Sequence, residues 1–167
     1  PANTSQGGPS RLIALAKDPY QRNFLLGQEG KNVHARLRHN GKSGDKPHLI
    51  TSNAPLSTRR THLVHTYDGN VERLYINGVL QSAKVTRTGA YSGWYTNHLL
   101  SIGNESTNNR PFAGTVELVA IYNRALVGSE VKQNYNAGTT TSSVPDTTPP
   151  STPGSLSARS LSTTSVE

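Results

Sequence analysis

Six histidines are the first side chains in this sequence that could hold a metal ion or move a proton: His34, His39, His48, His62, His65 and His98. None of them forms the i, i+4 pair on a helix that zinc proteases use. His62 and His65 stand three residues apart in a run that we expect to be a strand, so their side chains point to opposite faces. We therefore interpret the histidines as surface or packed residues and expect no metal site.

Carboxylates are the second candidate, because glycoside hydrolysis uses a pair of them. The acids here are scattered and fall mostly in expected turns: Asp18, Glu29, Asp45, Glu105 and Glu117. Glu72 has no second acid at an alternating position of its strand. The sequence thus predicts no catalytic residue, and an enzyme domain acting on polysaccharide, a hydrolase or a lyase, is kept as the alternative interpretation.

Basic side chains give the chain a formal net charge of +7, and many of them gather between residues 34 and 48. Arg36 and Arg38 share one face of an alternating run with His34, which aims their charge at solvent. Arginine forms bidentate contacts with carboxylate or sulfate, so Arg36 and Arg38 are predicted to bind an anionic polysaccharide. The alternative is a solvated face that keeps the protein soluble. Nucleic acid is not expected, because aromatic side chains for base stacking are sparse near these residues.

Aromatic side chains cluster in the stretch TGAYSGWYTNH, which contains Tyr91, Trp94 and Tyr95. Aromatic rings on loops can stack on the apolar faces of sugars, and Asn97 could add hydrogen bonds. The competing interpretation is that these rings fill the core, as large aromatic residues often do. We predict that Tyr91, Trp94, Tyr95 and Asn97 contact a ligand.

Short β-rich runs separated by turn residues would position these side chains. They cover residues 11–16, 23–28, 33–38, 61–67, 71–84, 98–103 and 115–122. Asn77-Gly78 in the middle of 71–84 is typical of a type I′ hairpin turn. Only 129–137 has a helical pattern. The fold class predicted is an all-β antiparallel sandwich or jelly roll with one short C-terminal helix. Nothing before residue 11 reads as a strand, so N-terminal strands are expected to be missing.

The last part of the chain has a different composition. Residues 139–167 are mostly Ser, Thr and Pro, which predicts an extended linker after a folded body at 1–138. There is no cysteine, hence no disulfide framework. There is also no apolar run of about 18 residues that could span a membrane. A start at Pro1 and an open-ended linker indicate a module of a larger polypeptide, and we expect that polypeptide to be secreted, most simply by a bacterium.

Two stretches carry a resemblance to a known family. THLVHTYDGNVERLYINGVL, over 61–80, resembles the middle hairpin of laminin-G-like jelly rolls in the concanavalin A-like superfamily. The stretch 99–138 is similar to that family's C-terminal signature, with Ile102-Gly103, the Pro-Phe-Ala-Gly turn at 111–114 and the Ile-Tyr-Asn-Arg-Ala-Leu run at 121–126.

This resemblance implies a noncatalytic carbohydrate-binding or adhesion module, extracellular or at the cell surface, with a purely structural spacer as a further alternative. Metal binding in the family also draws on the N-terminal part, which this sequence lacks, so calcium is not expected as a cofactor. The tail sequence DTTPPSTPGSLSARSLSTTSVE resembles the opening of a fibronectin type III repeat, which implies further modules of the same polypeptide as partners.

Overall fold

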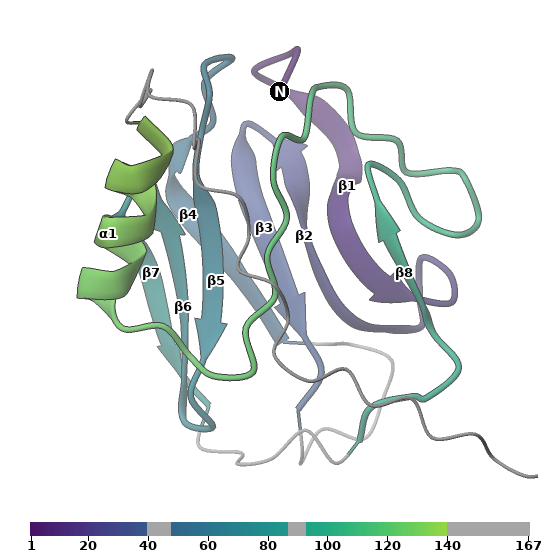
Figure 1. Cartoon of the computed structure of the whole chain (residues 1–167). Coiled ribbons are helices and arrows are strands. Elements are labelled where there is room, and N and C mark those ends of the chain that lie inside the picture. Colours follow the sequence, from purple (N-terminus) through teal and green to yellow (C-terminus); the bar gives the residue numbers. More distant parts are fainter. Residues whose placement is uncertain (40–47, 87–92, 140–167) are drawn as a thin grey trace, which may run out of the picture.

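The computed structural model describes residues 1–39, 48–86 and 93–139, and these residues form two antiparallel sheets and one helix (Figure 1). The first sheet has five strands in the order β4-β3-β2-β1-β8 and the second has three in the order β5-β6-β7. The bounds are β1 Gln6–Ala16, β2 Arg22–Gly30, β3 Asn32–Leu37, β4 His48–Pro55, β5 Leu63–Tyr67, β6 Val71–Ile76, β7 Val79–Val85, β8 Leu99–Ile102 and α1 Gly128–Thr139. The predicted β-sandwich with one short helix is confirmed.

Strand β3 shows how the sandwich is held together. Its alternating side chains send Val33 and Ala35 to one face, where they are fully buried, while His34 and Arg36 point to the other. Val33 and Ala35 pack against Leu74 and Ile76 of β6, and Ile50 and Leu56 complete the cluster. We call the face of the five-stranded sheet that meets β6 its inner face and the opposite one its outer face.

The hairpin of β6 and β7 turns at Asn77 and Gly78, as predicted. Their φ angles are 51° and 76°, which are the two positive values that a type I′ turn requires. The side chain of Asn77 also accepts a hydrogen bond from the backbone N–H of His62, at 2.9 Å. The turn thereby ties the start of β5 to the hairpin.

Two strands differ from the expectation. β1 begins at Gln6, so the prediction that no strand precedes residue 11 is wrong. A register shift between Gln6 and Ser10, across Gly7, Gly8 and Pro9, breaks the alternation that would have revealed this part of the strand. β4, over His48–Pro55, was not predicted, because HLITSNAP mixes polar and apolar residues without a clear period.

Residues 115–122 are the opposite case, since a strand was predicted and the structure has none. The sequence TVELVAIY has strand propensity, but no strand among the described residues pairs with it. Its apolar side chains are correspondingly open to solvent, with Leu118 84% and Ile121 63% exposed. Figure 1 shows this part of the chain crossing the front of the five-stranded sheet toward α1.

Helix α1 covers part of the three-stranded sheet. Val131 is buried against Tyr75 of β6 and Leu126. Glu130 accepts a hydrogen bond from the N–H of Val127 at 2.9 Å, which satisfies a donor at the helix start. In the part of the chain that the structure describes, no helix is both long and apolar enough to cross a membrane. The predicted linker and the fibronectin-like stretch fall in residues 140–167, outside the described residues, and stay predictions.

The stability of the fold should depend strongly on Leu74, which is 0% exposed between the two sheets. Leu74→Ala should lower the free energy of unfolding by about 2–5 kcal/mol, because the removed side chain leaves a cavity. Urea denaturation followed by circular dichroism measures this change. Val79→Ala, at a position 56% exposed, is the matched control and should stay within about 0.5 kcal/mol. Equal effects of the two changes would contradict the assigned core.

Candidate functional site

The segment that contains Trp94 and Tyr95 is fixed to the ends of β2 and β3. The side chain of Asn23, at the start of β2, is fully buried and makes two hydrogen bonds with the backbone of Tyr95. Its Nδ2 donates to the Tyr95 carbonyl at 2.7 Å, and its Oδ1 accepts from the Tyr95 N–H at 2.9 Å. The indole N–H of Trp94 donates to the carbonyl of Arg38 at 2.6 Å. These bonds hold the segment in place across 56 to 72 residues of sequence.

Trp94 and Tyr95 have different environments. The ring of Trp94 is partly buried and lies 5.8 Å from the ring of Phe24, so it mainly anchors the segment. Tyr95 is 40% exposed, and its ring stacks on His98 at 4.7 Å. The guanidinium carbon of Arg38 lies 4.6 Å from the Tyr95 ring centroid, within the range of a cation–π contact. Tyr95 is thus an exposed ring whose position is fixed from two sides.

Arg36 and Arg38 differ in their exposure to solvent, which the alternating pattern did not predict. Arg36 lies on the outer face opposite Leu25 and is partly exposed. Arg38 is only 8% exposed, so the expectation that it faces solvent is wrong. β3 ends at Leu37, and just beyond it the backbone N–H of Arg38 donates to the carbonyl of Asn23. The guanidinium of Arg38 turns toward the ring of Tyr95 and donates to the carbonyl of Arg22. Arg38 therefore supports the ring of Tyr95.

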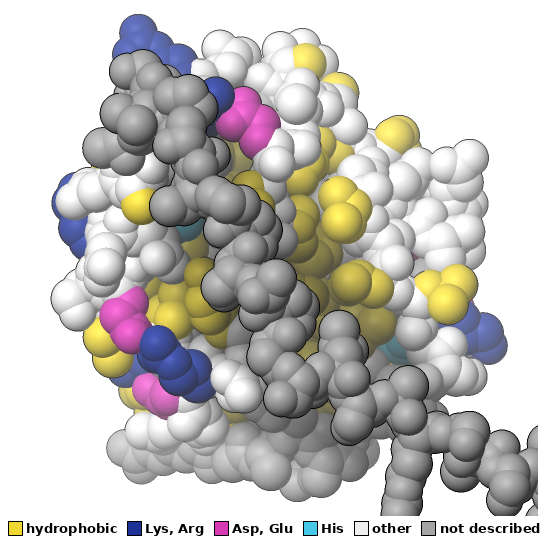
Figure 2. Space-filling view, in the orientation of Figure 1, with side chains coloured by type: hydrophobic (Ala, Val, Ile, Leu, Met, Phe, Trp, Pro, Cys, Tyr) yellow, Lys and Arg dark blue, Asp and Glu magenta, His cyan; other side chains and the backbone are white. Residues whose placement is uncertain are grey.

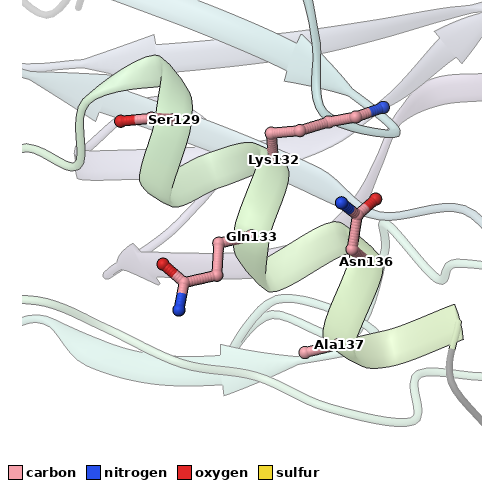
Figure 3. Close-up of a pocket in the computed structure, with 5 residues that line it drawn as sticks. All are labelled: Ser129, Lys132, Gln133, Asn136 and Ala137. Carbon is pink, nitrogen blue, oxygen red and sulfur yellow. The ribbon is translucent and has the colours of Figure 1, made fainter.

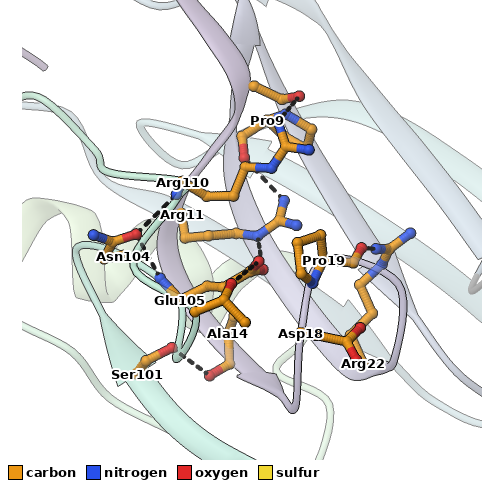
Figure 4. Close-up of polar contacts among 12 residues, drawn as sticks. Pro9, Arg11, Ala14, Asp18, Pro19, Arg22, Ser101, Asn104, Glu105 and Arg110 are labelled. Atoms are coloured by element: carbon orange, nitrogen blue, oxygen red, sulfur yellow. Dashed lines mark hydrogen bonds and ion pairs between the residues drawn. The ribbon is translucent and has the colours of Figure 1, made fainter.

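Further arginines lie nearby, Arg11 and Arg22 on β1 and β2 and Arg110 in the segment after β8 (Figure 4). Arg11 of β1 is buried and its Nε donates to Oε2 of the buried Glu105 at 2.9 Å. Arg110 donates to the carbonyl of Gly8 at 3.1 Å. Arg22 donates to the carbonyl of Pro19, while its Nε is buried without a hydrogen-bond partner among the described residues.

Arg22 shows how strongly cationic this face is. Burial, together with the positive charges of Arg36, Arg11 and Arg38, lowers its pKa to about 10. Glu105 is the negative charge that acts against them, and it is already paired with Arg11. A negatively charged ligand next to Arg22 and Arg36 would therefore relieve repulsion within the protein. Sequence patterns did not single out Arg22 or Arg11, because only strand pairing brings them near Arg36.

A second polar cluster lies between the sheets. Glu72 of β6 is 0% exposed and faces inward on the same side as Leu74. Its carboxylate oxygens lie 3.2 Å from Nε2 of His39 and 3.5 Å from Nε2 of His65, and the ring of Tyr67 stacks on His39. His39 and His65 are thus two of the groups that contact the Glu72 carboxylate. Among the described residues, no group of three or more His, Asp or Glu could hold a metal ion.

The structure says less about the other two residues predicted to contact a ligand, Asn97 and Tyr91. Asn97 is exposed beside the Tyr95 segment, and Tyr91 lies in 87–92, outside the described residues. An open depression on α1 is lined by Ser129, Lys132, Gln133, Asn136 and Ala137 (Figure 3). It comes from one helix and offers neither an aromatic ring nor a buried charge. The structure therefore brings Trp94, Tyr95 and Arg38 into contact, while Arg36 joins this candidate site only through its charge, which like that of Arg38 acts on Arg22.

The hydrogen bonds of Asn23 make a direct prediction for this site. Asn23→Ala removes both bonds to Tyr95, so the segment should loosen and the free energy of unfolding should fall by about 1–3 kcal/mol. Trp94 is the only tryptophan of the chain, and its fluorescence should shift to the red and become easier to quench with iodide. Asn97→Ala, at an exposed position nearby, is the control. An unchanged Trp94 spectrum in Asn23→Ala would show that these bonds do not hold the segment.

A further prediction follows from the buried ion pair of Arg11 and Glu105. Glu105→Gln leaves the Arg11 guanidinium buried without its counter-charge, which should cost about 3–5 kcal/mol of stability. Glu117→Gln is the matched control, because the Arg60–Glu117 pair is exposed and worth at most about 1 kcal/mol. Thermal or urea unfolding of both variants measures the difference. A loss for Glu105→Gln no larger than for Glu117→Gln would contradict the buried pairing.

The match to a known protein family agrees with this architecture. The profile described as the Concanavalin A-like lectin/glucanases superfamily, the third laminin G family, matches residues 2–132. A solved structure of an S-layer domain-containing protein (residues 221–444) from Clostridium thermocellum ATCC 27405 is 23% identical with a TM-score of 0.41. The match covers 67% of this chain and 55% of that one, so the chain spans about half of the solved fragment. No curated protein matches. The family match covers most of the chain, which therefore belongs to the laminin-G-like family of the concanavalin A-like lectin/glucanases superfamily.

Proposed function

We propose that this chain is a noncatalytic carbohydrate-binding or adhesion module of the cell surface or extracellular space, and that it prefers anionic polysaccharide. The observation that carries the proposal is the exposed ring of Tyr95, held rigidly beside the arginines of the outer face. The family's description, which names lectins, supports a carbohydrate ligand. Other modules of the same polypeptide would be its further partners.

The fixed position of Tyr95 favours binding, because a ring that is already ordered loses little conformational entropy when a sugar packs against its exposed edge. Asn23 holds the backbone of Tyr95, Trp94 anchors the segment, and Arg38 and His98 contact the ring. In this proposal the exposed edge of Tyr95 contacts the sugar and Asn97 adds hydrogen bonds. Trp94 and Arg38 act by positioning Tyr95.

The preference for negative charge rests on Arg36 and Arg22. Arg36 is partly exposed on the outer face, and Arg22 carries a buried Nε that lacks a hydrogen-bond partner among the described residues. Planar guanidinium groups fit the carboxylates of uronic acids and the oxygens of sulfate esters, with short charge-assisted hydrogen bonds. The nearby acid Glu105 is already neutralised by Arg11. The outer face thus attracts polymers whose repeating units carry carboxylate or sulfate.

Affinity electrophoresis tests the proposal, with alginate, hyaluronan and dextran sulfate as anionic probes and dextran as the neutral one. The anionic polymers should retard the protein, and added salt should weaken this retardation. Arg36→Ala should weaken binding roughly 10–100-fold, since one charge-assisted contact contributes about 1.5–3 kcal/mol. Tyr95→Ala should weaken it as well, because the change removes the exposed ring edge that contacts the sugar.

Arg59→Ala is the matched control, because it removes the same charge from an exposed position on another part of the chain and should leave binding nearly unchanged. Equal losses for Arg36→Ala and Arg59→Ala would reduce the effect to net charge and contradict a defined site. Retardation by none of the polymers would overturn the function itself. Release of reducing ends or of unsaturated products from the same polymers would show instead that the chain is an enzyme.

A further inference from the structure

His98 is a buried titratable side chain at the candidate site. It stands directly before β8, is only 8% exposed, and its ring stacks on that of Tyr95 with 4.7 Å between the centroids. Both of its ring nitrogens are buried without a hydrogen-bond partner among the described residues. A buried polar group without a partner is costly, and the cost rises steeply when the group carries a charge. His98 therefore fits its place only as the neutral imidazole.

Two positive charges near His98 disfavour its protonation as well. Arg38 contacts the same tyrosine ring, with its guanidinium carbon 4.6 Å from the ring centroid. Lys17 directly follows Ala16, the last residue of β1, which pairs with Leu99 next to His98. Figure 2 shows basic side chains and a histidine, but no acidic side chain, at the lower right of this view, where β8 begins.

Asp18 is the acid among the described residues that acts against these charges. Its Oδ1 accepts the backbone N–H groups of Tyr20 and Gln21, both at 2.7 Å, so this oxygen is already engaged in the turn after β1. Burial is the main reason that the pKa of His98 lies below its ordinary value of 6.5, and the two cations act in the same direction. Burial and the cations thus outweigh the acid.

We propose that His98 makes the ligand site sensitive to acid: its protonation ends the stacking on Tyr95, so that the segment of Trp94 and Tyr95 loosens and the polysaccharide is released. The ligand in this inference rests on the proposed function, whereas the loosening needs no ligand. Well above pH 6.5 the imidazole is neutral whether stacked or released, so the stack is fully stable. Below that pH the released ring takes up a proton more readily than the stacked one, and the stacked arrangement loses stability as the pH falls.

The fluorescence of Trp94, the only tryptophan of the chain, tests the loosening without any ligand. Between about pH 7.5 and about pH 5 its emission should shift to the red and become easier to quench with acrylamide. His98→Phe keeps an aromatic ring beside Tyr95 but cannot take up a proton, so this variant should show no such shift. His62→Phe is the matched control and should retain the shift, because His62 also stacks on a tyrosine and burial also lowers its pKa.

Affinity electrophoresis with dextran sulfate tests the release. Sulfate esters keep their charge over this pH range, so a loss of binding in acid cannot come from the polymer. Binding by the unmodified protein should weaken about 3–10-fold between the two pH values, the range expected for the loss of one aromatic pair. Protonation of other histidines adds positive charge and acts in the opposite direction. His98→Phe should therefore bind in acid at least as well as at neutral pH.

An NMR titration of the His98 Cε1–H in the unmodified protein tests the same inference without a variant. A pKa at or above 6.5 would overturn it, and so would a red shift that His98→Phe retains. A fluorescence shift that His98→Phe abolishes, without retardation by any polymer, would support the acid response and overturn the proposed function alone. Retardation that does not weaken in acid would leave the proposed function standing and overturn this inference.

Discussion

The alternation of β3 is the constraint on which both the fold and the candidate site depend. Val33 and Ala35 enter the core against Leu74 and Ile76, which leaves Arg36 on the outer face beside the other arginines. A slip of one residue would put a guanidinium into the core and expose the apolar residues, and burying an unpaired charge there is far too costly. The contact between the two sheets therefore fixes the register of β3, and the register fixes the charge of the outer face.

The same strand also determines how the aromatic segment is held. β3 ends at Leu37, and beyond it the carbonyl of Arg38 accepts the Trp94 indole N–H while its side chain turns toward Tyr95. Asn23 sits directly opposite Arg38 and holds Tyr95 from the neighbouring strand. Positive charge and aromatic surface thus meet at one end of β2 and β3, although they come from distant parts of the sequence. Glu105 offsets the buried Arg11, whereas Arg22 and Arg36 have no paired carboxylate among the described residues.

The sequence predicts those features that depend on neighbouring residues. The Asn77-Gly78 turn, the alternation of β3 and the family motifs after residue 61 are all local, and each is confirmed. β4 and the start of β1 were missed, because a bulge and a mixed composition hide their period. The burial of Arg38 and the presence of Arg22 and Arg11 at the site depend on which strands pair, which single-residue patterns do not reveal. The absence of a strand at 115–122 has the same origin, since a strand needs a partner as well as propensity.

The uncovered apolar surface and the candidate ligand site lie on opposite faces of the five-stranded sheet. Leu100 and Ile102 face inward with Ile13, whereas Arg36 faces outward opposite Leu25. Events on the inner face can therefore change the stability of the sandwich without touching the arginines, because the sheet separates them. The core cluster of β3, β4 and β6 is complete by itself, and it lies directly behind Arg36. The geometry of the outer face thus depends on that half of the sandwich, whatever covers the remainder.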